Sequence, residues 1–277
     1  MKRNIAGLFM AGLLGFWVLQ TVEASSRKEA DPPQEPEKKP AVLTVGALPV
    51  PYAEILNAAK PDLAALNIEL RVVEFTDYEA PNSALLAGNL DANYFQHRPY
   101  LESNPVWKAA LVPVFGVHIE PVGLYARSVK TAEDLKDGAV IAIPKGSDGR
   151  VRALQLLQSR GLIALNPKSG PKPALPDIAD NPKNFKFQEI EEPQLLRSIE
   201  ENAAAVMSGT FAAQAGFHPL KDALLTEGAD SRYGIYVVVK KGNEQDPRIK
   251  TLQEVLCSQK IKEYLIDAWN GKVLAFF

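Results

Sequence analysis

Short apolar runs recur along the chain and are separated by glycine, proline and charged residues. Several runs alternate apolar and polar positions or are rich in β-branched residues, which is typical of strands. Residues 67–75 are the clearest case, because Ile68, Leu70 and Val72 fall on one side of an extended chain. The other predicted strands are residues 41–50, 90–95, 139–144, 185–190, 203–209 and 234–242, and residues 110–126 hold two more, separated at Glu120-Pro121.

Between the strands, apolar positions recur every three or four residues, which is the spacing of amphipathic helices. Pro81 suits the first turn of a helix over 80–88, and Gly88 ends it. Thr131 is the expected cap of a short helix over 130–136. The remaining predicted helices are residues 52–66, 151–160, 194–201, 210–216 and 247–269, the last as one long closing helix.

Strands that alternate with helices indicate parallel β-α-β units and an α/β fold. The alternation restarts near Gly123, which favours two α/β lobes. We expect one lobe at 41–122 plus 236–277 and the other at 123–235, with two stretches of chain crossing between them. Ligands bind at the carboxyl ends of such strands and at domain interfaces, so the pattern predicts a binding cleft between the lobes.

Residues 75–101 contain an aromatic-rich segment, with Tyr94, Phe95, His97 and Tyr100 within seven positions. One interpretation is a loop whose rings pack into the core, as most aromatic clusters do. The other is an aromatic wall with one polar group, lining a pocket for a small ligand with an apolar tail. Spacing alone leaves both interpretations open.

The first 24 residues have the features of an export signal, with Lys2 and Arg3 before an apolar run and a small residue at Ala24. We expect cleavage after Ala24, although the apolar run just reaches the length of an uncleaved membrane anchor. Residues 25–40 are charged and proline-rich, which predicts a disordered tether. No cysteine follows the apolar run, so we expect no lipobox cysteine, and a location in the periplasm or at the extracytoplasmic face of the cell membrane.

Composition and motif content reduce the number of possible functions. The formal net charge is −2 without a basic block, which argues against nucleic acid as a partner. Cys257 is the single cysteine, which excludes an intramolecular disulfide and a multi-cysteine metal site. No other metal-ligating residue stands at ligand spacing from His97, so neither a metal nor another cofactor is expected. Catalytic motifs such as Ser-His-Asp, paired carboxylates, a P-loop or GxGxxG do not stand out, so an enzyme is not predicted.

Two segments carry a more specific pattern. The first is F-x-D-Y-x-x-P-N-x-A-L over 75–85, and the second is G-x-L-D-A-N-x-F-Q-H-x-P-Y-L over 88–101. Together with H-x-E-P-x-G over 118–123 and E-x-P-Q-L over 191–195, they resemble the NlpA/MetQ family, the substrate-binding components of methionine ABC importers. The resemblance covers almost the whole chain after residue 40. It implies a two-lobed, type II-like periplasmic binding protein fold that closes on its ligand by a hinge motion.

The resemblance also implies a site for methionine or a related amino acid. Tyr78, Phe95 and Tyr100 match positions that line the apolar tail of the ligand, and His97 matches a histidine beside them. A thioether tail packs well against aromatic rings. The alternatives are ordinary wall packing for the tyrosines, and a structural histidine whose ring Gln96 holds in place.

Opposite these rings, Arg152 matches the arginine of the family that binds the ligand, and Arg150 is a further candidate. An arginine fork or a helix N-terminus is what a carboxylate requires. The alternative for this segment is an exposed helix start capped by Asp148. In one interpretation, Glu120 accepts a hydrogen bond from the ligand's ammonium. In another, it pairs with a residue on the other side of the hinge.

The chain departs from the family at two positions, where Gly149 and Ser208 replace asparagines. The second of these asparagines contacts the head group of the amino acid in the family, so Ser208 stays a candidate ligand contact. Loss of one buried hydrogen bond to a ligand typically costs about 1–3 kcal/mol. The resemblance therefore implies the fold more firmly than it implies methionine as the ligand.

Two functions follow from the resemblance and these departures. The first is a monomeric solute-binding protein that delivers methionine or a related amino acid to the membrane permease of an ABC importer. The second is a divergent member with altered or lost ligand binding, acting as a periplasmic or surface interaction protein. Gly149 and Ser208 motivate the second.

Overall fold

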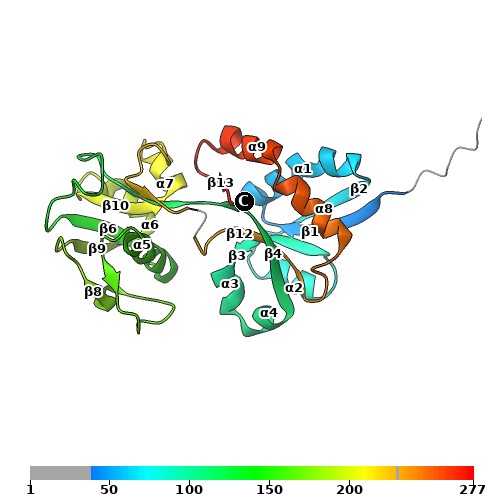
Figure 1. Ribbon diagram of the computed structural model, residues 1–277, viewed down its shortest axis with the longest axis horizontal. Coiled ribbons are helices and arrows are strands. Elements are labelled where there is room, and N and C mark those ends of the chain that lie inside the picture. The colour runs from blue at the N-terminus through cyan, green and yellow to red at the C-terminus, as the bar shows by residue number, and fades with distance from the viewer. Residues whose placement is uncertain (1–38, 229–230) are drawn as a thin grey trace, which may run out of the picture. The chain divides into compact units, whose positions relative to one another are not determined.

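The computed structural model describes residues 39–228 and 231–277. The expected signal segment at 1–24, and the expected tether at 25–40 up to residue 38, lie outside the described residues. Residues 39–277 form one compact unit that holds two larger sheets and a small two-stranded one (Figure 1). The predicted α/β fold class is confirmed.

The first sheet has six strands in the order β13-β4-β12-β3-β1-β2. β1 is parallel to β2 and β3, whereas β12 runs antiparallel to β3 and β4. The alternation expected for β2 is present, because Ile68 and Leu70 are buried while Glu69 and Arg71 are exposed. The strands are β1 (Ala41–Ala47), β2 (Ile68–Glu74), β3 (Ala92–His97), β4 (Leu111–Ile119), β12 (Ile235–Lys240) and β13 (Leu274–Ala275).

Helices cover both faces of this sheet (Figure 1). Three of them pack into the larger apolar cluster on one face: α1 (Glu54–Ala65), α8 (Pro247–Leu256) and α9 (Gln259–Trp269). Three shorter ones cover the other face: α2 (Ala80–Leu86), α3 (Arg98–Ser103) and α4 (Pro105–Ala110). A π-helical turn at Pro49–Ala53 leads into α1.

The second sheet has five strands in the order β11-β5-β10-β6-β9. Ile141 and Ile143 face one apolar cluster, and Ala142 between them faces another, as the period of two requires. Helix α5 (Ser147–Ser159) packs on the first of these faces, and α6 (Glu192–Ser198) and α7 (Gly209–Gln214) pack on the second. The strands are β5 (Val122–Tyr125), β6 (Val140–Pro144), β9 (Lys186–Ile190), β10 (Ala204–Ser208) and β11 (Leu225–Thr226).

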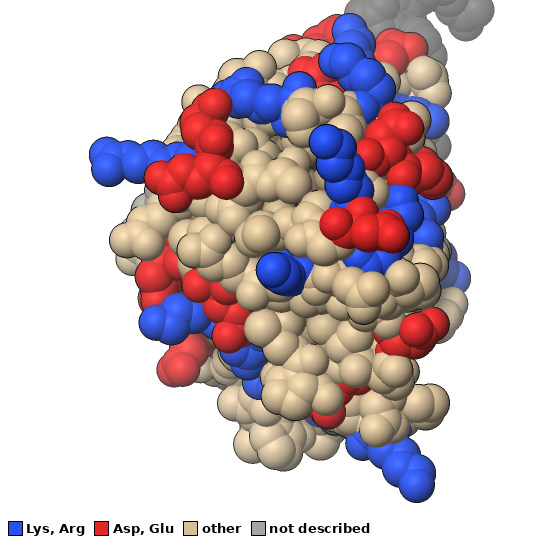
Figure 2. Space-filling model, turned by 90° about the vertical axis from the view of Figure 1, so that its left-hand side faces the viewer, with Lys and Arg blue, Asp and Glu red and all other residues tan. Residues whose placement is uncertain are grey.

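Two stretches of chain pass between the sheets, one from β4 into β5 and one from β11 into β12. Outside the larger sheets, β7 (Ala164–Leu165) pairs with β8 (Ile178–Asp180), and a 3-10 turn spans Leu175–Asp177. At the end of the molecule that holds the second sheet, Figure 2 shows acidic and basic side chains interspersed. Within the described part of the chain, no helix is long and apolar enough to cross a membrane.

Three predicted helices need correction. The segment 130–136 forms turns rather than a helix: its backbone bonds span only three residues, and Thr131 donates its hydroxyl hydrogen to Asp134 Oδ2 at 2.8 Å. So short a segment gains too few bonds to nucleate a helix. The closing helix is two helices, because Ser258 caps α9 by accepting a bond from the Ile261 amide. Helix α5 begins at Ser147, four residues earlier than expected.

Candidate ligand-binding site

A cavity of about 390 Å³ lies at the ends of strands from both sheets. The seven candidate residues from the sequence all line it: Tyr78, Phe95, His97, Tyr100, Glu120, Arg152 and Ser208. The chain places three of them at the ends of β3 and β10 and in the link between β4 and β5. Four more residues complete the lining: Tyr52, Gln96, Tyr233 and Ile235.

Three aromatic rings form one wall of this cavity. The centroids of Tyr78, Phe95 and Tyr100 lie 6.0–6.4 Å from one another, at tilted or edge-on angles. The Tyr100 hydroxyl donates a hydrogen bond to the Tyr78 carbonyl at 2.8 Å, which ties the loop before α2 to α3. Phe95 is fully buried, whereas Tyr78 is 58% exposed and stands at the rim. The wall is therefore both part of the core and open to a ligand.

A buried amide network stands behind the aromatic wall. The side chains of Asn82, Asn93 and Gln96 are 0–2% exposed and bond to one another at 2.7–3.0 Å. Asn93 also donates to the Pro81 carbonyl. Because Asn82 and Pro81 belong to α2 while Asn93 and Gln96 belong to β3, the network fixes α2 against β3. Gln96 bonds these amides, so it does not hold the His97 ring.

His97 has a structural role and also faces the cavity. Its Nδ1 accepts a hydrogen bond from the Tyr100 amide at 3.1 Å and thereby caps α3. Burial, with the positive charge of Arg152 adding to it, lowers the pKa of His97 to about 4. The ring is therefore neutral near pH 7 and, with Nδ1 as acceptor, carries its proton on Nε2. It packs edge-on against Tyr233, with ring centroids 5.1 Å apart.

Arg152 is held by a carboxylate that no sequence motif singles out. Its Nε lies 2.7 Å and 2.9 Å from the two carboxylate oxygens of Glu227, and its Nη2 lies 2.5 Å from Glu227 Oε2. Glu227 also accepts a bond from the Val122 amide at 3.0 Å. The two side chains are 18% and 8% exposed, so the ion pair is largely buried. The two residues are 75 positions apart, so only the fold reveals this pair.

The remaining contacts of Arg152 fix the plane of its guanidinium. Nη2 also donates to the Glu120 carbonyl at 2.7 Å, and the guanidinium stacks 4.6 Å from the centroid of the Tyr233 ring. Within residues 39–228 and 231–277, Nη1 alone among its nitrogens has no protein acceptor. Arg152 can therefore donate to a ligand through Nη1, but it does not offer two unpaired nitrogens for bidentate binding of a carboxylate.

Glu120 also lines the cavity, and its side chain contacts a chain of polar groups that leads into the core. Its Oε1 accepts a bond from the Tyr52 hydroxyl at 3.0 Å and lies 3.8 Å from His118 Nε2. His118 is fully buried, and its Nδ1 bonds the Tyr94 hydroxyl. Burial alone would raise the pKa of Glu120, but His118, Tyr52 and Arg152 together hold that pKa below its ordinary value. The carboxylate is therefore ionised at neutral pH.

A second cavity, of about 200 Å³, adjoins the first and shares four lining residues with it: His97, Arg152, Ser208 and Tyr233. Gly149, in the first turn of α5, lies on its wall. The N-terminus of α5 has no side-chain cap. Ser208 caps α7, because its hydroxyl accepts a bond from the Phe211 amide at 3.4 Å.

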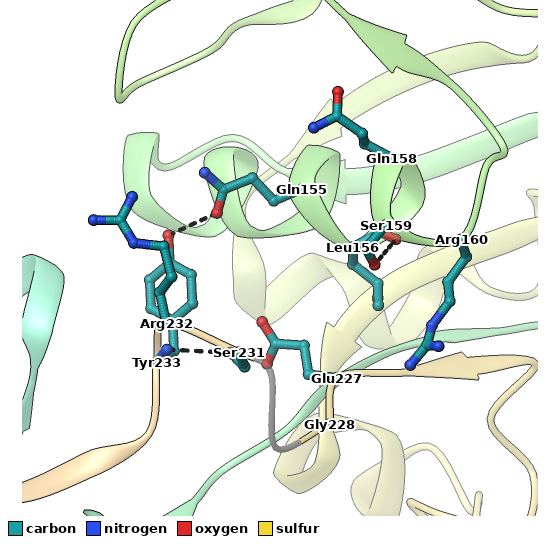
Figure 3. Close-up of a pocket in the computed structure, with 10 residues that line it drawn as sticks. All are labelled: Gln155, Leu156, Gln158, Ser159, Arg160, Glu227, Gly228, Ser231, Arg232 and Tyr233. Atoms are coloured by element: carbon teal, nitrogen blue, oxygen red, sulfur yellow. Dashed lines mark hydrogen bonds between the residues drawn. The ribbon is translucent and has the colours of Figure 1, made fainter.

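Two neighbouring features lie outside these cavities. Arg150 turns away and bonds Glu189 at 2.8 Å. A separate cavity of about 240 Å³ lies beside α5, where Gln155 accepts a bond from the Tyr233 hydroxyl (Figure 3). None of the seven candidate residues lines this separate cavity. Among the described residues, no group of three histidine, cysteine or acidic side chains is placed to hold a metal ion.

Solved structures give the class of protein. A periplasmic substrate-binding protein of an ABC transporter from Coxiella burnetii is 33% identical, with a TM-score of 0.63 over 84% of this chain and 99% of that chain. A nutrient-binding protein from Burkholderia cenocepacia, bound to methionine, is 33% identical, with a TM-score of 0.63 over 85% of this chain and 100% of that chain. The fold is that of the substrate-binding proteins, which bind solutes and are not enzymes.

The family follows from the sequence comparison. The chain belongs to the NlpA lipoprotein family, whose sequence profile matches residues 43–277. The methionine-binding lipoprotein MetQ of Bacillus subtilis (strain 168) is 38% identical over 241 residues, covering 84% of this chain and 87% of that protein. The family predicted from the two segments at 75–85 and 88–101 is thereby confirmed.

Proposed function

We propose that this chain is the solute-binding component of an ABC importer and binds methionine or a related amino acid in the 390 Å³ cavity. The observation that carries the proposal is the convergence of all seven candidate residues on one cavity. Methionine-binding relatives and the methionine-bound Burkholderia structure support the choice of ligand.

Each part of a methionine molecule has a complementary group in the cavity. The thioether tail packs against Tyr78, Phe95 and Tyr100, since sulfur contacts the edges and faces of aromatic rings favourably. The ammonium binds the ionised Glu120 carboxylate, a charge-assisted hydrogen bond. The ligand's carboxyl end faces Arg152, with Ser208 beside it.

We propose further that residues 41–122 plus 236–277 form one lobe and residues 123–235 the other. The links between β4 and β5 and between β11 and β12 would then act as the hinge, because a few residues between packed elements absorb such a motion. Closure would bring Arg152 and Ser208 onto a ligand held by the aromatic wall. The closed monomer would deliver the ligand to a membrane permease on the extracytoplasmic side.

A divergent member that has lost its ligand site is less well supported. Such a protein is expected to fill the cleft with its own side chains. Here two adjoining cavities remain between the aromatic wall and the N-terminus of α5.

Isothermal titration of the ligand-free full chain with L-methionine, D-methionine and other amino acids tests the proposal. The variant Glu120→Gln is expected to bind methionine about 10- to 100-fold more weakly, because an ammonium loses its charged acceptor. The control Arg150→Gln lies outside both cavities and should bind as the parent chain does. Absence of binding to every amino acid, or equal binding by Glu120→Gln and the parent, would contradict the proposal.

A further inference from the structure

His118 is a fully buried histidine that does not line the ligand cavity. It belongs to β4, where β12 pairs with its backbone on one side and β13 on the other. Its Nε2 lies 3.8 Å from Glu120 Oε1, and within residues 39–228 and 231–277 this nitrogen has no hydrogen-bond partner. A buried polar atom without a partner is destabilising, so its presence in a packed core requires an explanation.

The Tyr94 hydroxyl determines which nitrogen of His118 carries the proton. Burial raises the pKa of Tyr94 well above its ordinary value, so the phenol keeps its proton beside His118 Nδ1. If Nδ1 carried the ring proton, the Tyr94 hydroxyl hydrogen would have no acceptor in the described part of the chain, and the lone pair of Nε2 would face a carboxylate. Both costs disappear when Tyr94 donates to Nδ1. The network therefore assigns the ring proton to Nε2, the nitrogen beside Glu120.

Two donors approach the same oxygen of Glu120. The Tyr52 hydroxyl donates to Oε1 at 3.0 Å, and His118 Nε2 lies 3.8 Å from that oxygen. His118 and Glu120 are two positions apart at the end of β4, where alternate side chains share a face. The Glu120 backbone is fixed separately, since its carbonyl accepts a bond from Arg152 Nη2 at 2.7 Å. Oε2 accepts no bond from the residues that the structure describes, so this oxygen is available to a ligand.

We propose that His118 is a positioning residue for ligand recognition: its Nε2–H holds the Glu120 carboxylate where the ligand's ammonium binds, and Tyr94 fixes the required tautomer. The inference rests on the proposed function and adds a residue that selects for the ammonium without touching the ligand. At 3.8 Å the interaction is electrostatic rather than a full hydrogen bond, and the low dielectric of the core strengthens it.

The ring must also be neutral, because a protonated His118 would offset the negative charge that Glu120 presents to the ammonium. Burial lowers the pKa of His118, which keeps the ring neutral at neutral pH. The Glu120 carboxylate, whose pKa lies below its ordinary value, therefore keeps its full charge for the ligand.

Two ligands that differ only in the ammonium test this role. Isothermal titration of the ligand-free full chain compares L-methionine with 4-(methylsulfanyl)butanoate, which has a hydrogen in place of the ammonium. His118→Phe keeps a ring in the core and removes the donor. It is expected to lower the affinity for L-methionine about tenfold and to leave that for the butanoate within about twofold. His118→Gln retains an N–H near the position of Nε2 and is expected to restore most of the L-methionine affinity.

Tyr94→Phe gives an independent test, because it removes the hydroxyl that sets the tautomer and leaves His118 in place. It is expected to lower the affinity for L-methionine about threefold and to leave that for the butanoate unchanged. The matched control Tyr125→Phe removes a hydroxyl that is equally buried and donates to the Pro219 carbonyl at 2.8 Å, outside both cavities. This control should leave both affinities unchanged. Urea denaturation before each titration establishes that the variants are folded.

Three results would each overturn the inference: equal losses for the two ligands in His118→Phe, no gain of His118→Gln over His118→Phe, or equal effects of Tyr94→Phe and Tyr125→Phe. Binding of L-methionine by the parent chain would still uphold the proposed function in those cases. Failure of the parent chain to bind L-methionine would overturn both.

Discussion

The ion pair of Arg152 and Glu227 decides what the site offers to a ligand. A bidentate carboxylate behind the guanidinium fixes its plane, and the stacked Tyr233 ring holds its other side. Pairs of this kind do not add much net stability, because both groups lose their hydration. Here the pair fixes the position of the guanidinium. Removal of one partner would leave the other buried without a compensating charge.

The substitution Glu227→Gln tests this account. It keeps the shape of the side chain and removes its charge, so we expect a loss of about 3 kcal/mol in the free energy of unfolding, measured by urea denaturation. The control Glu200→Gln breaks the exposed pair with Arg127 and is expected to change stability far less. Equal effects of the two substitutions would show that burial of the Arg152 pair has no energetic role.

His97 makes stability depend on pH. The ordinary pKa of the ring in an unfolded chain is 6.5, and burial lowers it to about 4 in the folded protein. Between these values the unfolded chain binds a proton that the folded chain does not, so stability falls as the pH decreases through this window. The full effect is about 3 kcal/mol.

We therefore expect His97→Asn to flatten the pH dependence of the unfolding free energy between the two pKa values of the ring, 6.5 and about 4. Asparagine is a suitable replacement because its side-chain oxygen can still cap α3. Some slope will remain, because burial also lowers the pKa of His118. An unchanged slope in urea denaturation series across this window would contradict the assignment.

At the scale of elements, the amide network of Asn82, Asn93 and Gln96 connects α2 to β3 and so supports the aromatic wall. Buried networks of this kind are stabilising only when every member is bonded. The network therefore connects the aromatic wall to Asn82 and Asn93, which do not line the cavity.

The substitution Asn93→Leu would leave the amides of Asn82 and Gln96 partly unpaired. We expect a loss of about 3 kcal/mol in unfolding free energy together with weaker ligand binding, measured by urea denaturation and calorimetry. The same change at the exposed Asn166 should have a small effect on stability and none on binding. Weaker stability with unchanged affinity would show that the wall does not depend on the network.

Local sequence signals predicted most elements and missed some boundaries. Strands β1, β2, β3 and β6 follow their apolar patterns closely, because each buries at least one continuous face. The helix expected at 130–136 is absent. Ala132 and Leu135 are buried in the core as a helical spacing would require, but turns place them there. The break between α8 and α9 has a local signal, the cap Ser258, but the apolar spacing continues through it and hides the break.

At the scale of the whole molecule, ligand binding is expected to stabilise the folded chain. A ligand at 100 times its dissociation constant adds about 2.7 kcal/mol to the free energy of unfolding. For a chain of this size that is a rise of roughly 5–10 °C in Tm. Differential scanning calorimetry with and without the ligand measures it. The Glu120→Gln variant should show a smaller rise at the same ligand concentration, and an equal rise in both would contradict binding at this cavity.

The sequence by itself determined the order of most strands and helices, the α/β class, the family and the seven candidate residues. These properties depend on local periodicity and on motifs within short segments, which a linear chain displays directly. The convergence of those residues, the Glu227 partner of Arg152 and the second cavity emerged only from the tertiary structure. Arg152 and Glu227 are 75 positions apart, and Tyr52 and Glu120 are 68 apart. Contacts over such separations depend on how the two sheets pack, and no spacing along the chain encodes them.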